Sequence, residues 1–434
     1  SAAPGCADTP ASRSSWGATV SGSDRAVAPA LEALRALGVT AHVGHDAANL
    51  PAGEGVEVFH SSAIAADDPE RVAALERGLT VRPRAALLAE LSALKPTIAV
   101  AGAHGKTTTT SMIAHVLLRC GLEPAYLIGG ALTTTGLNAD WGAGEWLVVE
   151  ADESDRSMLS LDVDVAVVTN VELDHHATYG SLEEVREVFR TFLRGARSAV
   201  LWERPDVVAL REGAAYVGFD APGAVLDHDG SRFRWGELDV RLRVPGEHNA
   251  RNAAAALEAC ALAGADPQAA VAALEDFAGA GRRFQALGTT DAGAHVVDDY
   301  AHHPTELAAT IAAARTLRPR RLVALFQPHL YSRTAHLARE LGTALAAADV
   351  AAVLDVYPAR ERGEDFPGVS GLLVAEAAAD AAEGGPVLWL RTQADAVRTL
   401  EALLREGDLC LVLGAGDVDA VGRRLVAGAA AEPA

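Results

Sequence analysis

The chain has 434 residues and carries 37 Lys and Arg against 58 Asp and Glu, which gives a formal net charge of −21. A strongly acidic chain is a poor ligand for polyanions, so this charge excludes sequence-independent binding to nucleic acid or to anionic lipid. Hydrophobic residues make up 50% and charged residues 22%, which is the composition of globular proteins. Because a single core stops growing at roughly 250–300 residues, the length predicts two or three domains.

No apolar run reaches the ~20 residues that a membrane-spanning helix needs. The first ten residues show no charged segment followed by an apolar one, so no secretory signal is expected. The four cysteines have no paired spacing, which suits a reducing compartment and favours neither a disulfide framework nor a zinc site. The sequence therefore predicts a cytoplasmic protein.

Short apolar runs alternate with helical stretches along the chain, a pattern typical of βα units and largely parallel sheets. In the first part, strands are expected at 17–20 and 56–59, and helices at 29–37, 69–77 and 84–94. Lys95 and Pro96 then interrupt the helical pattern, so the first domain is predicted to span 1–95.

The second domain is predicted at 96–285 and the third at 286–434. Strands of the second domain are expected at 97–102, 146–150, 163–169 and 238–244, and its helices follow Lys106 and Ser181 and cover 249–263. Strands of the third domain are expected at 296–299, 322–326, 350–356, 387–390 and 409–413. The predicted fold class is α/β, with three domains in series.

Residues 98–110 combine an apolar strand, a glycine turn and a lysine–threonine run that opens a helix. Glycines let backbone N–H groups surround a phosphate, the helix N-terminus attracts the anion, the lysine supplies a charge and a threonine can hold Mg²⁺. The strict P-loop pattern would need glycine at Val100, so the loop is a shortened form. Only two of the 37 basic residues are lysines, and Lys106 is one of them, which adds weight to a phosphate site here.

This loop and seven further motifs follow the order found in the Mur ligases, and the chain resembles this family of ATP-dependent amide-forming enzymes of peptidoglycan precursor synthesis. The motifs occupy 101–110, 150–155, 169–175, 245–252, 282–284, 298–306, 326–334 and 355–361. The resemblance covers about residues 17–417. It implies a Rossmann-like UDP-sugar domain, a P-loop ATPase-like central domain and a Rossmann-like C-terminal domain.

The forms of the motifs at 150–155, 298–306 and 326–334 resemble those of the member that adds the first amino acid. Its reaction uses ATP and Mg²⁺ to join L-alanine to the carboxylate of UDP-N-acetylmuramate through an acyl phosphate. UDP-N-acetylmuramate and L-alanine are then the expected partners, with no nucleic acid and no membrane span. The alternatives are a related muropeptide ligase that recycles a tripeptide, and a Mur-like nucleotide-binding protein without catalytic activity.

The resemblance also assigns individual residues. At ATP it places Gly102, Ala103, His104, Gly105, Lys106, Thr107, Thr108, His248, Asn249, Asn252, Arg283 and Asp299. At Mg²⁺ it places Thr107, Glu150 and His175. At the uridine nucleotide it places segments with Ser23, Asp24, Ser61, Ser62 and Arg84, and at alanine Tyr300, His302 and Arg333. Ordinary structural roles are the alternatives: a strand-end acid for Glu150, helix caps for Asn249 and Asn252, and a packing residue for His302.

Three of these residues are the predicted catalytic ones: Lys106, which supplies a charge at the phosphate loop, Arg283, which resembles the arginine at the transferred phosphate, and His302 at the amine. An amine must be neutral to attack, and histidine titrates near neutrality, so we hypothesise that His302 helps to deprotonate the alanine ammonium.

Two places depart from the family pattern. Leu330 stands where a second arginine often occurs, which puts a two-arginine clamp on the amino-acid carboxylate in doubt. Residues 1–15 hold neither the first apolar strand nor the glycine-rich loop, G-x-G-G-x-G-M, that receives the UDP diphosphate. We expect a truncated or wrongly assigned start rather than a lost UDP site.

Overall fold

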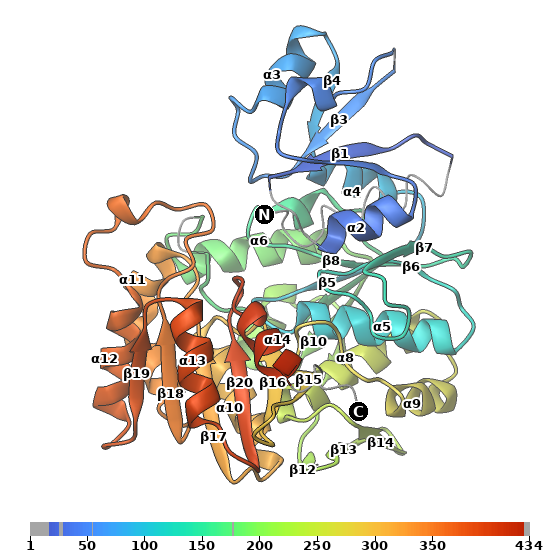
Figure 1. The fold of residues 1–434 in the computed structure, drawn as a ribbon. Coiled ribbons are helices and arrows are strands. Elements are labelled where there is room, and N and C mark those ends of the chain that lie inside the picture. Colours follow the sequence, from blue (N-terminus) through green and yellow to red (C-terminus); the bar gives the residue numbers. More distant parts are fainter. Residues whose placement is uncertain (1–16, 26–28, 54, 176–177, 429–434) are drawn as a thin grey trace, which may run out of the picture. The chain divides into compact units, whose positions relative to one another are not determined.

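The computed structural model describes residues 17–25, 29–53, 55–175 and 178–428 (Figure 1). Their contacts form two compact units. The first contains the chain up to Asp174, Thr178–Asp220 and Asn252–Leu274; the second contains His175, Ala221–Arg251 and the chain from Glu275. The expectation about residues 1–15 lies outside the described residues.

The first part of unit 1 holds two small parallel sheets. β1 (Ser21–Asp24) pairs with β2 (Thr40–Val43), and β3 (Glu57–His60) pairs with β4 (Thr80–Pro83). The helical segments here are α2 (Pro29–Ala36), η1 (Ala47–Asn49), α3 (Pro69–Glu76) and α4 (Arg84–Ser92). The strand expected at 17–20 is wrong: the strand is the polar segment Ser21–Asp24, because pairing with β2 rather than local hydrophobicity sets its position.

A seven-stranded sheet dominates the rest of unit 1, in the order β11-β10-β9-β5-β8-β6-β7. Its strands are β5 (Thr97–Ala101), β6 (Ala125–Leu127), β7 (Ala139–Trp141), β8 (Leu147–Glu150), β9 (Val165–Val168), β10 (Ser198–Trp202) and β11 (Val217–Phe219). β5 lies between β8 and β9, and all five of its residues are buried. A parallel strand covered on both faces reads as a continuous apolar run, which is why the sequence located it within one residue.

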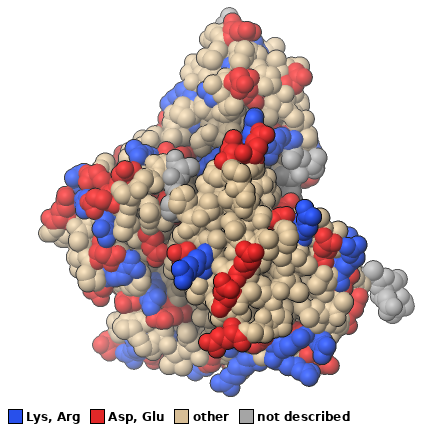
Figure 2. All heavy atoms as spheres, turned by 90° about the vertical axis from the view of Figure 1, so that its left-hand side faces the viewer, with Lys and Arg blue, Asp and Glu red and all other residues tan. Residues whose placement is uncertain are grey.

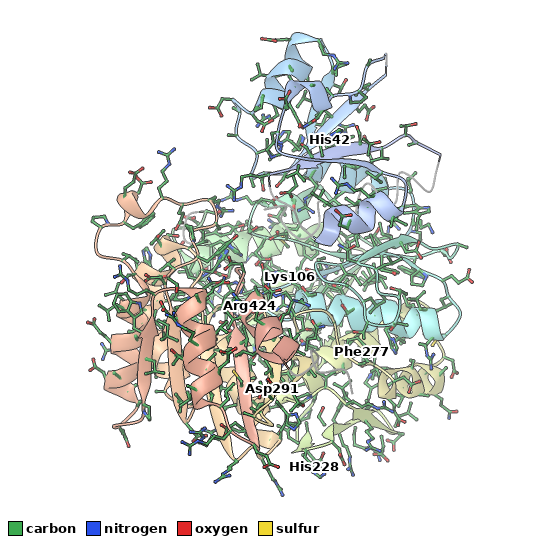
Figure 3. All side chains as sticks on the ribbon, in the orientation of Figure 1. His42, Lys106, His228, Phe277, Asp291 and Arg424 are labelled. Atoms are coloured by element: carbon green, nitrogen blue, oxygen red, sulfur yellow. The ribbon has the colours of Figure 1, made fainter. Side chains whose placement is uncertain are left out.

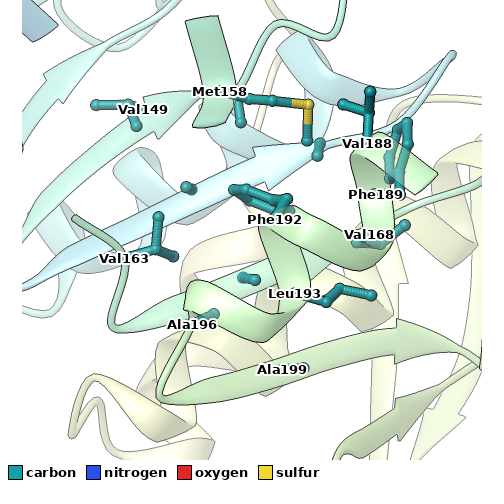
Figure 4. Close-up of a cluster of buried hydrophobic side chains, with 14 of the residues drawn as sticks. Val149, Met158, Val163, Val168, Val188, Phe189, Phe192, Leu193, Ala196 and Ala199 are labelled. Carbon is teal, nitrogen blue, oxygen red and sulfur yellow. The ribbon is translucent and has the colours of Figure 1, made fainter. Parts of the chain in front are cut away.

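Helices complete this unit. They are α5 (Lys106–Arg119), η2 (Ser157–Ser160), α6 (Leu182–Gly195), α7 (Pro205–Val208), η3 (Ala209–Arg211), α8 (Glu247–Leu262) and α9 (Pro267–Glu275). The first residues of α8, up to Arg251, and the last residue of α9 belong to unit 2. The inner face of α6 packs Phe189 and Phe192 against Met158 and the strands, forming the cluster of Figure 4. This core supports the edge of the sheet at which β5 and β8 end.

Unit 2 has an antiparallel sheet of β12 (Val225–Asp227), β13 (Gly230–Trp235) and β14 (Leu238–Leu242). Its larger sheet has the order β15-β16-β20-β17-β18-β19. These strands are β15 (Gln285–Thr289), β16 (His295–Asp299), β17 (Arg321–Phe326), β18 (Val350–Leu354), β19 (Val387–Leu390) and β20 (Asp408–Leu413). The helical segments are α10 (Pro304–Thr316), α11 (Tyr331–Leu345), η4 (Gly363–Asp365), α12 (Gly371–Ala381), α13 (Gln393–Leu403) and α14 (Asp419–Ala427).

Alternate residues of β17 enter two separate cores. Ala324 and Phe326 belong to one cluster, and Val323 and Leu325 belong to the other. The period of two along a strand therefore gives this unit three layers, with helices on both faces of the sheet.

None of the described helices is long and apolar enough to cross a membrane. The face drawn in Figure 2 carries acidic and basic side chains interspersed with each other.

Candidate active site

The turn between β5 and α5 is built on two glycines with positive φ. Gly102 has φ 145°, and a Cβ there would lie 2.0 Å from Thr169 Oγ1. Gly105 has φ 84°, and a Cβ there would lie 2.7 Å from Asn252 Oδ1. A side chain at either position would therefore collide with the walls of the turn, so only glycine keeps the backbone in this conformation.

The motif after β9 holds this turn in place. Thr169 Oγ1 and Asn170 Nδ2 both donate to the His104 carbonyl, at 2.6 and 2.9 Å, and Asn170 Oδ1 accepts the His104 N–H at 3.0 Å. Glu172 lies 3.3 Å from His104 Nε2. The sequence singled out this motif for His175 alone, whereas its first residues fix the phosphate loop.

Lys106, labelled in Figure 3, is the first residue of α5. Its ammonium points back into the loop. Its Nζ donates to Gly102 O at 2.6 Å and to both carboxylate oxygens of Glu153, at 2.9 and 3.0 Å. Burial by itself lowers the pKa of Lys106, but the charges of Glu153, Asp152 and Glu150 more than offset this, so the pKa is raised. The lysine is therefore a fixed cation.

Thr107 and Glu150 are the predicted Mg²⁺ ligands of this unit. Glu150 ends β8, directly opposite Val100 of β5, and its Oε1 accepts the Gly129 N–H at 2.6 Å. Thr107 is the second residue of α5 and is buried. Hydroxyl and carboxylate oxygens are hard donors that Mg²⁺ prefers, so these two residues fit the ion. His175, in unit 2, has φ 55° and offers a ring nitrogen, a softer donor.

In unit 2, the predicted nucleotide residues His248 and Asn249 form the first turn of α8. Asn249 Nδ2 donates to Pro245 O at 2.7 Å, and this contact links the helix start to the preceding loop, unlike a cap contact, in which the side chain accepts from a backbone N–H. Burial, and then the nearby Arg251 charge, lower the pKa of His248 to about 4. Its imidazole is therefore neutral at pH 7.

Two arginines flank the ring of Tyr300, with Cζ of Arg282 and Arg283 at 5.1 and 5.0 Å from its centroid. Arg282 donates to Gly414 O at 2.7 Å, Gly416 O at 2.9 Å and Asp298 Oδ2 at 3.2 Å. Arg282 thus ties the strand ends together. Arg283 Nη1 lies 3.8 Å from Glu306 Oε1. The predicted catalytic residues Arg283 and His302 therefore both interact with the carboxylate of Glu306.

Asp299 accepts two backbone hydrogen bonds. Its Oδ2 accepts from the Phe284 N–H and its Oδ1 from the Ala301 N–H, both at 2.8 Å. Burial raises the pKa of Asp299 against the opposing charge of Arg283. The neighbouring Asp298 has a pKa raised to about 6 by burial, again opposed by its arginine partner, Arg282.

Two of the residues predicted to bind the substrate alanine, Tyr300 and His302, belong to a series of neighbouring aromatic rings. Ring centroids of Tyr300 and His302 are 5.5 Å apart, those of His302 and His329 6.0 Å, and His329 stacks on Tyr357 at 5.7 Å. His302 Nδ1 lies 2.9 Å from Tyr300 O and 3.3 Å from Glu306 Oε2. Because both neighbours accept, Nδ1 carries the proton and Nε2 is the basic nitrogen of the neutral ring.

Arg333 is 4% exposed, and its Nη1 lies 3.2 Å from His329 Nδ1. An arginine cannot accept, so His329 presents a lone pair at Nδ1 and fixes the guanidinium. Leu330, at the position of the doubtful second arginine, is buried with φ 69°.

The residues predicted to bind the uridine nucleotide lie at or just after the carboxyl ends of strands in the two small parallel sheets. Ser23 and Asp24 are the last two residues of β1, and Ser23 Oγ donates to Glu70 Oε2 at 2.7 Å and lies 3.0 Å from His45 Nδ1. Ser61 and Ser62 follow β3, and Arg84 follows β4, with its Nη2 4.0 Å from Asp155 Oδ2. In open α/β sheets, ligands bind at the carboxyl ends of the parallel strands, where these residues lie.

Sequence reasoning missed several residues of both units: Gly129, Glu153, Thr169, Asn170, Glu172, His329 and Glu306. All except Gly129 lie inside or beside motifs that the sequence had already singled out. A usable signal existed for Glu153, because a buried lysine needs an acid partner and this one lies three residues after Glu150.

A shortened P-loop after a buried strand, followed by a second α/β unit with clustered Arg, His and Asp, defines an ATP-using enzyme of the P-loop type. Three family models match in sequence order: the Mur ligase family, catalytic domain over residues 14–96, the Mur ligase middle domain over 100–260, and the Mur ligase, glutamate ligase domain over 282–416. The chain belongs to the Mur ligase family, and its three α/β domains lie in series.

Curated relatives and solved structures agree with this assignment. A UDP-N-acetylmuramate–L-alanine ligase of Streptomyces avermitilis is 43% identical, covering 94% of this chain and 92% of the relative, and one of Acidithiobacillus ferrooxidans is 44% identical, covering 93% and 90%. The crystal structure of UDP-N-acetylmuramate-alanine ligase MurC from Thermotoga maritima is similar with a TM-score of 0.82 and 27% identity, over 95% of this chain and 94% of that one. A murein peptide ligase from Psychrobacter arcticus shares the fold, with a TM-score of 0.73 at 23% identity and 100% and 98% coverage.

Proposed function

We propose that this chain joins L-alanine to the carboxylate of UDP-N-acetylmuramate in peptidoglycan precursor synthesis, converting ATP to ADP and phosphate. The observation that carries this proposal is a match of about 94% of the chain, at 42–44% identity, to ligases of this name. The phosphate loop around Lys106 and the ring series around His302 supply the chemistry that such a reaction needs.

A carboxylate is a poor electrophile, so ATP must first convert it to an acyl phosphate. We assign the triphosphate to the backbone of 102–105, the N-terminus of α5 and the ammonium of Lys106. Asn252, against Gly105, belongs to the same wall. In unit 2, Arg283 is assigned to the transferred phosphate, Asp299 to the ribose, and His248 and Asn249 to the adenine.

Thr107, Glu150 and His175 are the residues that would hold Mg²⁺. When bound, the ion would supply positive charge that offsets the negative charge of the phosphates. Glu150 is oriented for this task by the Gly129 N–H.

On the amine side, Arg333 is assigned to the alanine carboxylate, and Tyr300 shapes a small pocket. His302 accepts a proton from the alanine ammonium at Nε2, while the Glu306 carboxylate near Nδ1 stabilises the resulting imidazolium. The amine then attacks the acyl carbon and phosphate leaves. Ser23, Asp24, Ser61, Ser62 and Arg84 are assigned to the uridine nucleotide.

The domain limits and the compartment are parts of the same proposal. Limits at 1–95, 96–285 and 286–434 are supported by the family matches at 14–96, 100–260 and 282–416. A cytoplasmic location follows from the proposed substrates, since ATP and UDP-sugars are cytoplasmic metabolites.

The test is phosphate release from ATP in the presence of UDP-N-acetylmuramate, with and without L-alanine. We expect release that requires both substrates, and a mass gain on the nucleotide sugar equal to one alanine residue. Replacing L-alanine by the tripeptide L-alanyl-γ-D-glutamyl-meso-diaminopimelate is the control for the recycling activity. Release with the tripeptide and not with L-alanine would contradict the proposal in favour of that ligase.

A further inference from the structure

The ammonium of Lys106 is fully engaged inside its own loop. A lysine ammonium has three N–H donors and no acceptor. The three acceptors around Nζ are Gly102 O at 2.6 Å and the two carboxylate oxygens of Glu153 at 2.9 and 3.0 Å. All three donors are therefore used within the protein, and a phosphate oxygen can be bound only if one of these bonds is given up.

Glu153 has a buried side chain that has little contact with water. Its side chain is 3% exposed, and its own backbone carbonyl accepts a hydrogen bond of 2.5 Å from Tyr179 Oη. Tyr179 is 1% exposed and lies under the guanidinium of Arg156, whose Cζ is 5.3 Å from the ring centroid. The segment that carries Glu153 is thus anchored in the core, and the carboxylate stays beside the lysine.

The Glu153 carboxylate weakens the binding of a phosphate to the loop in two ways. It competes with the phosphate for the donors of Lys106, and its negative charge repels the phosphate at short range. The raised pKa of Lys106 agrees with a strong pairing of this kind. A residue that only shaped the loop would have the opposite effect, because its loss would weaken nucleotide binding.

We propose that Glu153 is a positioning residue that occupies Lys106 in the nucleotide-free protein and is partly displaced by the nucleotide phosphates. This inference rests on the proposed function, because it takes the loop as the ATP site. Its consequence is a built-in competition: the loop keeps its cation buried and neutralised without nucleotide, at the expense of affinity for ATP and ADP.

The test compares ADP binding to the full chain and to Glu153→Gln by isothermal titration calorimetry, each with Mg²⁺ and with EDTA. Glutamine keeps one acceptor for Lys106 and removes the charge. We expect the Kd for ADP to fall roughly tenfold in both conditions, the effect of one charge-assisted hydrogen bond. An unchanged or higher Kd with EDTA would overturn the proposal, and a higher Kd confined to Mg²⁺ would assign Glu153 to the metal instead.

The matched control is Glu183→Gln, which removes the same charge from an exposed acid of α6 that pairs with Arg190 and lies outside the loop and the 169–175 motif. We expect its Kd for ADP to change less than threefold, since only the general repulsion is lost. An equal gain in both variants would overturn the proposal, because a nonspecific charge effect would then explain it.

A second readout uses the fact that Lys95 and Lys106 are the only lysines in the chain. After labelling with ¹³C,¹⁵N-lysine, an NMR spectrum that correlates Nζ with the Hε protons gives one signal per lysine, two in all. Glu153→Gln, or Glu153→Asp if the first variant does not fold, is expected to shift one signal without nucleotide and leave the Lys95 signal in place. ADP is expected to shift the same signal in the parent protein. Failure of the variant to move it would overturn the inference.

These results separate the inference from the proposed function. If the parent protein binds ADP and Glu153→Gln binds it more weakly, the competition is refuted while the ATP site stands. If the parent protein binds no ADP with or without Mg²⁺, the ATP site and the inference fall together.

Discussion

At the scale of single residues, the proton positions around His302 make its role testable. With Nδ1 held between Tyr300 O and Glu306, the basic nitrogen is Nε2. His302→Gln is expected to lower kcat/KM for L-alanine by about 10²–10⁴-fold and to remove the acidic limb of its pH profile, because glutamine does not titrate. Steady-state rates from pH 6 to 9 measure this. A variant that keeps the activity and the profile of the parent would show that His302 has only a packing role.

Lys95, the other lysine, has a structural role, because defined contacts hold its ammonium group in place. Its Nζ donates to Gly142 O at 2.7 Å and Gly144 O at 2.6 Å and lies 4.8 Å from the centroid of the Trp141 ring. Burial lowers its pKa, and the two carbonyls and the ring take the place of water around the ammonium.

Lys95→Met is therefore expected to reduce the free energy of unfolding by about 2–3 kcal/mol, since two charge-assisted hydrogen bonds are lost. Urea denaturation measures this. The control is Arg398→Met, which removes a side chain that is 75% exposed and paired with the surface acid Asp395, and should cost less than about 1 kcal/mol. Equal losses in the two variants would contradict the role assigned to Lys95.

At the scale of elements, the strand–turn–helix of β5 and α5 depends on Gly102. Gly102→Ala places a Cβ 2.0 Å from Thr169 Oγ1 at φ 145°, so Thr169 must release the His104 carbonyl. We expect the Kd for ADP to rise at least about tenfold, because the backbone donors lose their alignment. Gly121→Ala is the matched control, since it has φ 75° and open space around its Cβ position. It should cost about 1–2 kcal/mol of stability and leave the Kd unchanged.

The same elements show what the sequence could predict. Buried parallel strands such as β5, β17 and β20 are apolar runs, and their limits were predicted within one or two residues. β1 and the hairpin strand β13 were not, because β1 has the sequence Ser-Gly-Ser-Asp and β13 alternates arginines with apolar residues; pairing with their neighbours makes them strands.

The candidate site divides in the same way. Motif residues such as Lys106 and Arg333 could be named from the sequence, because a family pattern marks them. Their partners could not, since Glu153 meets Lys106 across 47 positions of the chain, and no local pattern shows that contact. Even His329, which lies two residues before the start of α11 and four before Arg333, was missed because only the fold shows that its Nδ1 faces the guanidinium.

The start of α8 and the end of β16 give unit 2 two opposing pH dependences. His248 has a pKa of about 4, below its ordinary 6.5, so the unfolded chain binds this proton first and stability is lost as the pH falls from 6.5 to 4. Asp298 has a pKa of about 6, above its ordinary 3.8, so the folded chain binds this proton first and stability is gained as the pH falls from 6 to 3.8. The two contributions oppose each other in the parent protein.

Single variants are expected to separate them. His248→Gln should make the protein lose less stability than the parent between pH 6.5 and 4.5, and Asp298→Asn should make it lose more. Each difference is at most about 3 kcal/mol, the equivalent of roughly two pKa units. Urea titrations at several pH values measure the slopes. Parallel slopes for all three proteins would refute these assignments.

At the scale of the whole molecule, each compact unit has a hydrophobic core of its own. Phe189 belongs to the cluster of unit 1 (Figure 4) and Phe326 to one cluster of unit 2, and both are 0% exposed. A chain with separate cores does not follow a single two-state transition. We therefore expect two transitions in differential scanning calorimetry, each sensitive to substitutions in one core.

Phe189→Ala and Phe326→Ala are a matched pair for this test, because each removes a phenylalanine side chain from a fully buried position. Each is expected to cost about 3–5 kcal/mol in its own unit through lost burial and the cavity left behind. Phe189→Ala should lower the midpoint of one transition, Phe326→Ala the midpoint of the other, and the double variant should lower both by the sum of the single effects. A single transition that both substitutions lower equally would mean that the two cores unfold as one cooperative unit. In that case the pH effects of His248 and Asp298 would extend to the phosphate loop of unit 1, and the stability of the ATP site would depend on protonation in the other unit.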